Sequence, residues 1–214
     1  MLEKYHNLIS NLKPFVVTYS AQTQFETPKE IWGIKLTKEF IIDSLDEHSS
    51  SFFDKILKLD QLSFGNQGMS MPKWVVFDCA MMPGFIVGFS ISSNLLDEKD
   101  REMLGIGDNE YFPVSMYMAI PTKNSGTWFG HNLSSLNKIL HYPLNGLGLL
   151  TKAYALKLFE VKSLQGATQW DSKALFIHKK FGDLKILSKK VPLHTKENTL
   201  CYECSLENLE SILD

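Results

Sequence analysis

Hydrophobic residues recur along the chain at two spacings, which predict its helices and its strands. The clearest helix covers residues 146–159, where Leu147, Leu150, Tyr154 and Leu158 follow one another at intervals of three, four and four. Helical spacing also predicts helices over 2–12, 37–44, 51–62, 94–104 and 172–181. Short extended runs predict strands over 15–19, 31–36, 74–77, 85–91, 112–120, 127–136, 160–169, 184–187 and 199–206. The runs at 74–77 and 85–91 flank Met82-Pro83-Gly84 and predict a hairpin.

The order of these elements predicts the fold class. Early strands and helices are followed by antiparallel-looking hairpins and then by strand, helix, strand, helix and two strands, which indicates a mixed α/β or α+β sheet. No internal repeat, low-complexity tract or linker divides the 214 residues. We therefore expect one domain, with an N-terminal extension over 1–30 and a core over 31–214. A domain of this size buries roughly 70% of the surface of its unfolded chain, which is enough to enclose a pocket.

The strand at 127–136 has polar side chains on both faces. One face carries Phe129, His131, Leu133 and Ser135, and the other carries Trp128, Gly130, Asn132 and Ser134. A strand that only packs in a core would not need polar residues on both faces, so this strand is a candidate for the functional site.

Charge and composition narrow the classes of partner. Lys plus Arg is 22 and Asp plus Glu is 24, and this near-neutral balance gives no reason to expect nucleic acid or an anionic membrane surface. Arg101 is the only arginine, so any phosphate would have to be held by backbone N–H groups and lysines. The first residues lack the apolar core of a signal peptide, and no apolar run is long enough to span a membrane, so a cytoplasmic protein is the default expectation.

Three cysteines, an odd number, argue against a disulfide framework. Cys201 and Cys204 form a C-x-x-C, but no second Cys/His pair stands at metal-ligand spacing, and we expect no metal. The residues around them alternate like a strand, which would place the two thiols on opposite faces.

Gly146 and Gly148 begin the clearest helix. Glycines at such a turn let the backbone approach a ligand, and the N–H groups of the first helical turn favour a phosphate, here those of Leu147, Gly148, Leu149, Leu150 and Thr151. A merely flexible entry to the helix is the alternative. A dinucleotide loop fits poorly, because its third glycine would fall at Thr151.

The second half of the chain, from Lys73 onward, resembles the GNAT superfamily of acyl-CoA-dependent N-acyltransferases. The family's loop pattern Gln/Arg-x-x-Gly-x-Gly/Ala, whose amides hold the CoA pyrophosphate, is matched at both glycines by residues 143–148, with Pro143 where Arg or Gln is usual. The resemblance implies a mostly antiparallel central sheet flanked by helices. It also implies that Leu136 and Asn137, with Ser134 and Ser135, lie where the sheet opens for the pantetheine arm.

A later helix in the family follows the pattern Asn-x-x-Ala-x-x-x-Tyr-x-x-x-Gly, and the same spacing here gives Asp171, Ala174, His178 and Gly182. By this resemblance Asp171 and Ala174 line the CoA arm, and His178 stands at the position of the general acid. Asp171 can still cap the helix. An imidazole with a pKa near 6.5 would donate a proton to a thiolate more easily than a phenol. The alternative is that His178 is a half-buried histidine with a structural role.

His131 is the second candidate catalytic residue, because family members often place the group that deprotonates the amine on this strand. A histidine hydrogen-bonded in the core is the alternative. No G-x-S-x-G elbow is present to support a Ser-His-Asp hydrolase.

The resemblance implies transfer of an acetyl or other acyl group from CoA to the amine of a small molecule or peptide. Because Pro143 and His178 depart from the family pattern, a protein that binds acyl-CoA without transferring its acyl group stays open, and so does a protein-interaction adaptor. A homodimer is compatible with either. The family's use of CoA also predicts that the strand of His131 separates from the strand of Leu164 below the glycine turn.

Overall fold

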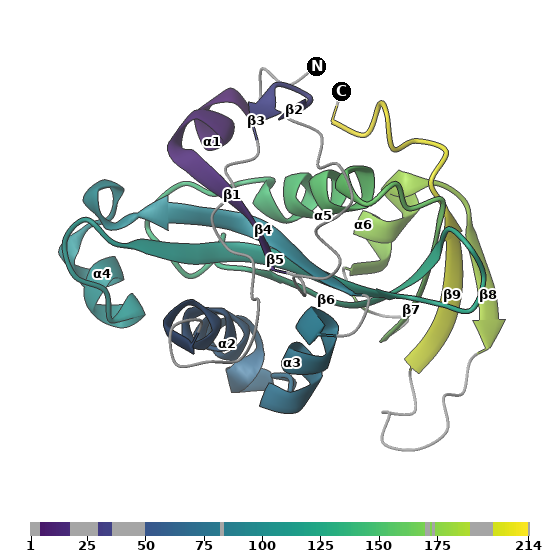
Figure 1. Ribbon diagram of the computed structural model, residues 1–214, viewed down its shortest axis with the longest axis horizontal. Coiled ribbons are helices and arrows are strands. Elements are labelled where there is room, and N and C mark those ends of the chain that lie inside the picture. The colour runs from purple at the N-terminus through teal and green to yellow at the C-terminus, as the bar shows by residue number, and fades with distance from the viewer. Residues whose placement is uncertain are drawn as a thin grey trace.

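The computed structural model describes residues 5–17, 30–35, 50–81, 84–169, 172, 174–188 and 199–213. Seven strands form one sheet in the order β1-β4-β5-β6-β7-β9-β8, and every neighbouring pair is antiparallel except β6 and β7. Helices lie on both sides of this sheet, with α5 and α6 on one face and α2 and α3 on the other (Figure 1). This confirms the expected α+β class with a mixed, mostly antiparallel sheet.

The N-terminal part begins with helix α1 (His6–Asn11) and continues directly into strand β1 (Leu12–Val17), which pairs with β4 at the edge of the sheet. Residues 12–17 therefore belong to the central sheet. The expected strand over 31–36 is instead a tight hairpin of β2 (Glu30–Ile31) and β3 (Ile34–Lys35). Its turn has positive φ at Trp32 (51°) and Gly33 (79°), a conformation that glycine adopts readily.

Helix α2 (Ser50–Phe64) confirms the prediction for 51–62 and is followed by a 3₁₀ turn, η3 (Gly65–Gln67). The hairpin prediction for 74–77 is wrong, because these residues belong to helix α3 (Lys73–Met81). Val76, Cys79 and Ala80 are buried at a spacing of three and four, which is the pattern of a helix face. A four-residue apolar run does not distinguish a strand from a buried helix. The expected helix over 37–44 lies outside the described residues.

The middle of the chain supplies the long strands. Strands β4 (Phe85–Ser92), β5 (Tyr111–Pro121) and β6 (Thr127–Ser135) confirm the predictions within a few residues. The single helix expected over 94–104 is a 3₁₀ turn, η4 (Ser93–Leu95), and a short helix, α4 (Glu98–Leu104). The Asp97 side chain accepts a hydrogen bond from the Asp100 amide at 2.8 Å, so α4 starts at this cap and ends at Gly105.

The last third of the chain follows the predicted order. Helix α5 (Leu147–Leu158), strand β7 (Ser163–Gln169), helix α6 (Ala174–Phe181) and strands β8 (Leu184–Ser188) and β9 (Thr199–Ser205) appear in turn. In β9 the Cys204 thiol is buried while Cys201 is half-buried, and both are free thiols, so the strand interpretation of the C-x-x-C is confirmed. Within the described segments, no helix has the length and apolar character needed to cross a membrane.

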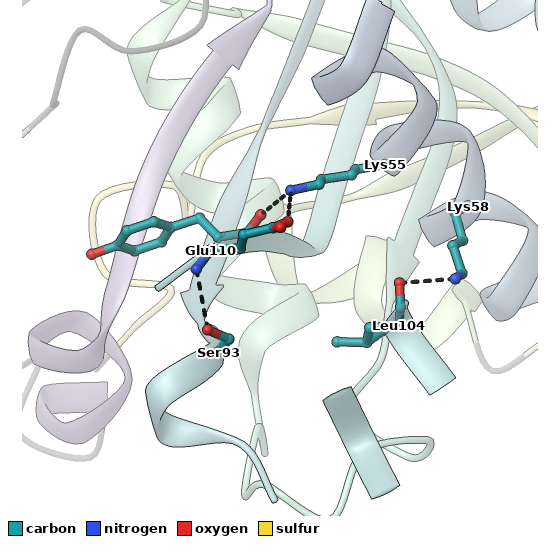
Figure 2. A network of polar contacts seen from close by, with 6 residues as sticks. Lys55, Lys58, Ser93, Leu104 and Glu110 are labelled. Carbon is teal, nitrogen blue, oxygen red and sulfur yellow. Dashed lines mark hydrogen bonds and ion pairs between the residues drawn. The ribbon is translucent and has the colours of Figure 1, made fainter. Parts of the chain in front are cut away.

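Lysines of α2 fasten this helix to the connection between α4 and β5 (Figure 2). Lys55 Nζ lies 2.7 Å from a carboxylate oxygen of Glu110, whose amide in turn donates to the Ser93 hydroxyl at 3.1 Å. Lys58 Nζ donates to the Leu104 carbonyl at 2.8 Å and so satisfies the carboxyl end of α4. These contacts hold α2 beside the sheet, next to the candidate site.

Candidate acyl-donor site

The amino end of α5 presents free backbone donors. Gly146 caps the helix with φ of 85°, a left-handed conformation that explains glycine at this position. The Leu147 amide donates to the Leu144 carbonyl and the Leu150 amide donates to the Gly146 carbonyl, each at 3.1 Å. The amides of Gly148 and Leu149 have no acceptor within the described residues. Of the five amides predicted to bind a phosphate, two therefore remain available among the described residues. They lie at the positive end of a 12-residue helix.

The first helix supports this glycine turn from behind. A Cβ atom on Gly146 would lie 2.8 Å from the Tyr5 ring, closer than real Cβ contacts, so the ring packs directly on the turn. Tyr5 is buried, although it stands near the start of the chain. The N-terminal segment thus contributes to the shape of the candidate site.

Strands β6 and β7 separate below this turn. They pair in parallel from Thr127 and Ser163 to Gly130 and Gly166, and no further. Beyond that point β6 continues to Ser135 paired only with β5, and β7 continues to Gln169 paired only with β9. The separation that the sequence predicted beside Leu164 is therefore present. Beyond that point the facing main-chain groups of the two strands do not pair with each other.

A β-bulge on β6 coincides with this separation. Met118 pairs with Asn132 and Ala119 pairs with Gly130, so His131 is the extra residue. Its ring lies edge-on to Phe129, with 5.2 Å between the centroids, and burial lowers its pKa. Neither ring nitrogen has a hydrogen-bond partner in the described part of the chain. The alternative of a core histidine held by hydrogen bonds therefore finds no support among the described residues. A neutral His131 imidazole at this position can accept a proton.

The bulge sorts the side chains of β6 onto two faces. A Cβ on Gly148 would be 3.9 Å from Leu133 and from Ser135, so these residues face α5. Asn132 and Ser134 face α2, where both hydrogen-bond to the Asp60 carboxylate. The Ser134 hydroxyl therefore makes a structural hydrogen bond.

Asp60 is a buried carboxylate on the α2 face. It accepts hydrogen bonds from the Met71 backbone amide at 2.6 Å, from the Asn132 side-chain amide and from the Ser134 hydroxyl at 3.4 Å. Burial raises its pKa, and the three donors oppose that shift. With its oxygens occupied, Asp60 positions β6 against α2 rather than reacting.

Polar atoms on the α5 face lack protein partners, which is what a ligand site requires. Ser135 Oγ, Thr151 Oγ1 and the Tyr117 hydroxyl are buried and have no hydrogen-bond partner in the described residues. Such groups are rare unless a water or ligand satisfies them. A pantetheine arm carries amides that could bond to these atoms, so the residues fit a CoA substrate.

His178 is buried between two polar neighbours. Its Nδ1 atom lies 2.5 Å from Lys152 Nζ, and its Nε2 atom lies 3.0 Å from the Tyr202 hydroxyl. Burial and the nearby charge of Lys152 lower its pKa to about 2, so the ring is neutral at neutral pH. The proton that we expected His178 to donate as imidazolium is not on this ring.

The remaining predicted residues have different surroundings. The Leu136 amide donates to the Val114 carbonyl at 2.9 Å, and its own carbonyl accepts from Ile139 and Leu140, so its backbone serves the fold. Asn137 is half-buried directly after it. Ala174 starts α6, where its amide donates to the Ser172 hydroxyl at 3.1 Å. Asp171 lies outside the described residues.

One group away from this site has metal-ligand geometry. Asp97, Asp100 and His141 offer ligand atoms within 4.8 Å of one another. The His141 ring already bonds to Asp97 at 2.8 Å and its amide donates to Asp100 at 3.0 Å, so the group fastens α4 to the segment before α5. The expected absence of a metal stays a prediction.

Comparison with known proteins identifies the class of fold. No family model and no curated protein sequence matches the chain. The solved ribosomal-protein-S18-alanine N-acetyltransferase from Escherichia coli matches with a TM-score of 0.50 and 8% identity, over 77% of this chain and 92% of that one. A putative N-acetyltransferase from Lactobacillus plantarum matches with a TM-score of 0.49 and 8% identity, over 92% and 99%. An aminoglycoside 6'-acetyltransferase type Ii matches at 0.49 and 16%, over 77% and 96%.

The chain therefore has the fold of N-acetyltransferases. More specifically, it has a divergent GNAT fold, as its glycine turn and its α6 spacing indicated. Identity this low establishes the fold alone, so the activity has to be argued from the residues of the site.

Sequence reasoning missed Lys152, Tyr202, Tyr117 and Asp60. Lys152 has a visible signal, because it interrupts a helix whose other residues are almost all apolar and buried. The strand glycines Gly130 and Gly166 are a second signal, since a glycine inside a strand often marks a close approach. Asp60 and Tyr202 have no signal of this kind, because only the fold brings them to the site.

Proposed function

We propose that this protein transfers an acyl group, in the simplest case acetyl, from CoA to an amine. The observation that carries the proposal is the end of β6–β7 pairing at Gly130 and Gly166, below a helix start where the Gly148 and Leu149 amides have no acceptor among the described residues. An extended ligand with a phosphate at one end can bond to the helix start and lie along the unpaired strand edges.

The two faces of the sheet would take different substrates. The donor lies on the α5 face, along Thr151, Ser135 and Tyr117, whose buried hydroxyl groups lack partners among the described residues. The amine approaches from the face of α2 and α3, where His131 stands at the bulge and takes the proton that the amine loses. Most of the rate enhancement would come from holding the two reactants in line.

Binding tests the donor site first. Calorimetry with acetyl-CoA is expected to show one site, and Gly148→Asp is expected to weaken it at least 10-fold relative to Gly148→Asn. The matched pair differs only in a charge that repels phosphate at the helix start. A Cβ at Gly148 meets only ordinary contacts at 3.9 Å, so both variants fit the fold. Equal affinities for the two variants would place CoA elsewhere.

Transfer is tested separately by following thiol release over a panel of amines and amino-terminal peptides. Release that depends on the amine supports an acyltransferase. Binding without release supports the alternative of a non-catalytic acyl-CoA-binding protein, which the departures at Pro143 and His178 motivate. Absence of binding refutes both and leaves the adaptor, for which a captured partner would be required.

A further inference from the structure

Lys152, His178 and Tyr202 form a continuous hydrogen-bonded row inside the protein, with one residue each from α5, α6 and β9. The Lys152 ammonium nitrogen is 2.5 Å from His178 Nδ1, and the Tyr202 hydroxyl is 3.0 Å from His178 Nε2. Lys152 has no exposed surface, and Tyr202 and His178 retain 3% and 9%. A fully buried lysine is rare unless it is paired.

Lys152 has no carboxylate partner within the described residues. Its Nζ atom lies 4.6 Å from the centre of the Phe181 ring and 5.5 Å from that of Tyr117, so aromatic faces replace a counter-ion. Burial lowers the pKa of Lys152 to about 7, and the nearby Cys204 thiol opposes this shift. Lys152 therefore exchanges its proton near neutral pH, while His178 beside it stays neutral.

This charge distribution fixes the direction of the hydrogen bonds. A protonated Lys152 can only donate, so His178 Nδ1 accepts and the ring proton stands on Nε2. His178 Nε2–H then donates to the Tyr202 oxygen. As a result the hydroxyl hydrogen of Tyr202 points away from His178 and is available to another acceptor. The assignment follows from the donor and acceptor capacities of the three groups.

The Tyr202 end of the row lies where β6 and β7 separate. A Cβ on Gly166 would be 2.5 Å from the Tyr202 hydroxyl, so this oxygen lies directly over the glycine. Gly166 pairs with Gly130 in the last paired step of the two strands. The Tyr117 hydroxyl, which has no hydrogen-bond partner in the described part of the chain, lies over Gly130 in the same way. The two phenol groups thus lie over paired glycines at the end of the β6–β7 pairing, where the proposed acyl transfer places the reacting end of the donor.

We propose that Lys152, His178 and Tyr202 are a proton relay that protonates the leaving thiolate, an inference that rests on the proposed acyl transfer. As the amine nitrogen bonds to the thioester carbon, the C–S bond breaks and its electron pair passes to sulfur. Tyr202 gives its hydroxyl proton to the thiolate and receives one from His178 Nε2, while Lys152 gives one to Nδ1. The amine's own proton leaves on the opposite face. After product release a proton from solvent enters at Tyr202 and the row runs in reverse: Tyr202 gives a proton to His178 Nε2, and Nδ1 returns one to Lys152.

The pKa values of the three residues explain why proton transfer needs all of them. Burial raises the pKa of Tyr202 above its ordinary value, which makes this phenol alone a poor acid. His178 has no spare proton at neutral pH. The row as a whole, however, ends with a neutral Lys152, whose pKa of about 7 lies below the roughly 8.5 of a free thiol. Net transfer from Lys152 to the thiolate is therefore downhill.

The first test uses the free protein and needs no turnover. Long-range ¹H–¹⁵N spectra of ¹⁵N-histidine-labelled protein should show His178 as the neutral Nε2–H tautomer at pH 6, where Lys152 is protonated. Lys152→Met should change the ¹⁵N chemical shifts of the His178 ring. Lys157→Met on the same helix should leave these shifts unchanged, because Lys157 pairs with Glu210 at the surface. A His178 ring that becomes charged between pH 6 and 8, or that carries its proton on Nδ1 at pH 6, would overturn the relay.

The second test uses turnover. Tyr202→Phe and His178→Ala should each lower kcat about 100-fold, the usual scale for loss of a general acid, with the calorimetric Kd for acetyl-CoA unchanged. In the wild-type protein kcat should fall as pH rises through 7, because Lys152 loses its proton, and Lys152→Met should abolish this fall. If wild-type protein turns over and all three variants keep its kcat, the relay is wrong and the acyltransferase stands. If wild-type protein does not bind acetyl-CoA, both are wrong.

Discussion

Gly130 and Gly166 are partners in the last paired step of β6 and β7, and a tyrosine side chain covers each of them. A Cβ on Gly130 would overlap the Tyr117 hydroxyl, and one on Gly166 would overlap that of Tyr202. No other residue type leaves this space open, because every other residue carries a Cβ. The pair of glycines thus places two phenol groups at the separation of the strands.

Gly130→Ala should destabilise the fold by about 1–3 kcal/mol, the usual cost of overpacking. Tyr117→Phe in the same chain should remove most of this cost, since the nearest remaining ring atom would be 3.2 Å from the new Cβ. Gly107→Ala is the matched control, because its Cβ meets only the Glu110 side chain at 3.4 Å. Urea unfolding of both single variants and the double variant measures the coupling. Strictly additive energies would contradict the predicted overlap.

Stability should depend on pH through Lys152. Its pKa is about 7 in the folded protein against 10.5 for an ordinary lysine, so between these values the unfolded chain binds more protons. The free energy of unfolding should therefore rise with pH from about 7 to about 10. Lys152→Met should flatten this rise, and Lys157→Met should retain it. Urea unfolding at several pH values measures this free energy. If it changes with pH equally in the wild-type and Lys152→Met proteins, the pKa of Lys152 is not lowered in the folded protein.

Asp60→Ala should destabilise the protein by about 2–4 kcal/mol, because it leaves the Met71 amide, the Asn132 side chain and the Ser134 hydroxyl without their acceptor. Asp54→Ala on the same helix is the control, since Asp54 is exposed and should contribute little. Urea midpoints of the two variants give the comparison. Equal midpoints would mean that Asp60 does not hold β6 against α2.

The sequence predicts the fold well where the hydrophobic periodicity continues over many residues. Helix α5 and strands β5 and β6 were predicted within two residues, because many apolar positions define each period. Residues 74–77 were misassigned because four apolar residues fit a strand and a buried helix turn equally. The glycine turn and the separation of β6 from β7 were also predictable, from Gly146, Gly148 and the resemblance that they support.

The chemistry of the candidate site was less predictable than its position. Lys152, His178 and Tyr202 are spaced 26 and 24 residues apart and come from three elements, so their contact depends on packing that spacing does not reveal. The spacing identifies His178 as a site residue, but its protonation state depends on its burial and on the charge of Lys152, and both are known only from the fold. Asp60 and Asn132, 72 residues apart, illustrate the same limit on the other face of the sheet.

The overlap of each tyrosine with its glycine has a consequence for the way sequences of this kind are compared. Tyr117 and Gly130, and likewise Tyr202 and Gly166, occupy space that only one member of each pair can fill, so a change at one position constrains what the other accepts. In an alignment the four positions should therefore vary together, even where the overall identity is too low for the sequences to be matched. A search weighted on this joint pattern would separate proteins that share this arrangement from those that share only the fold.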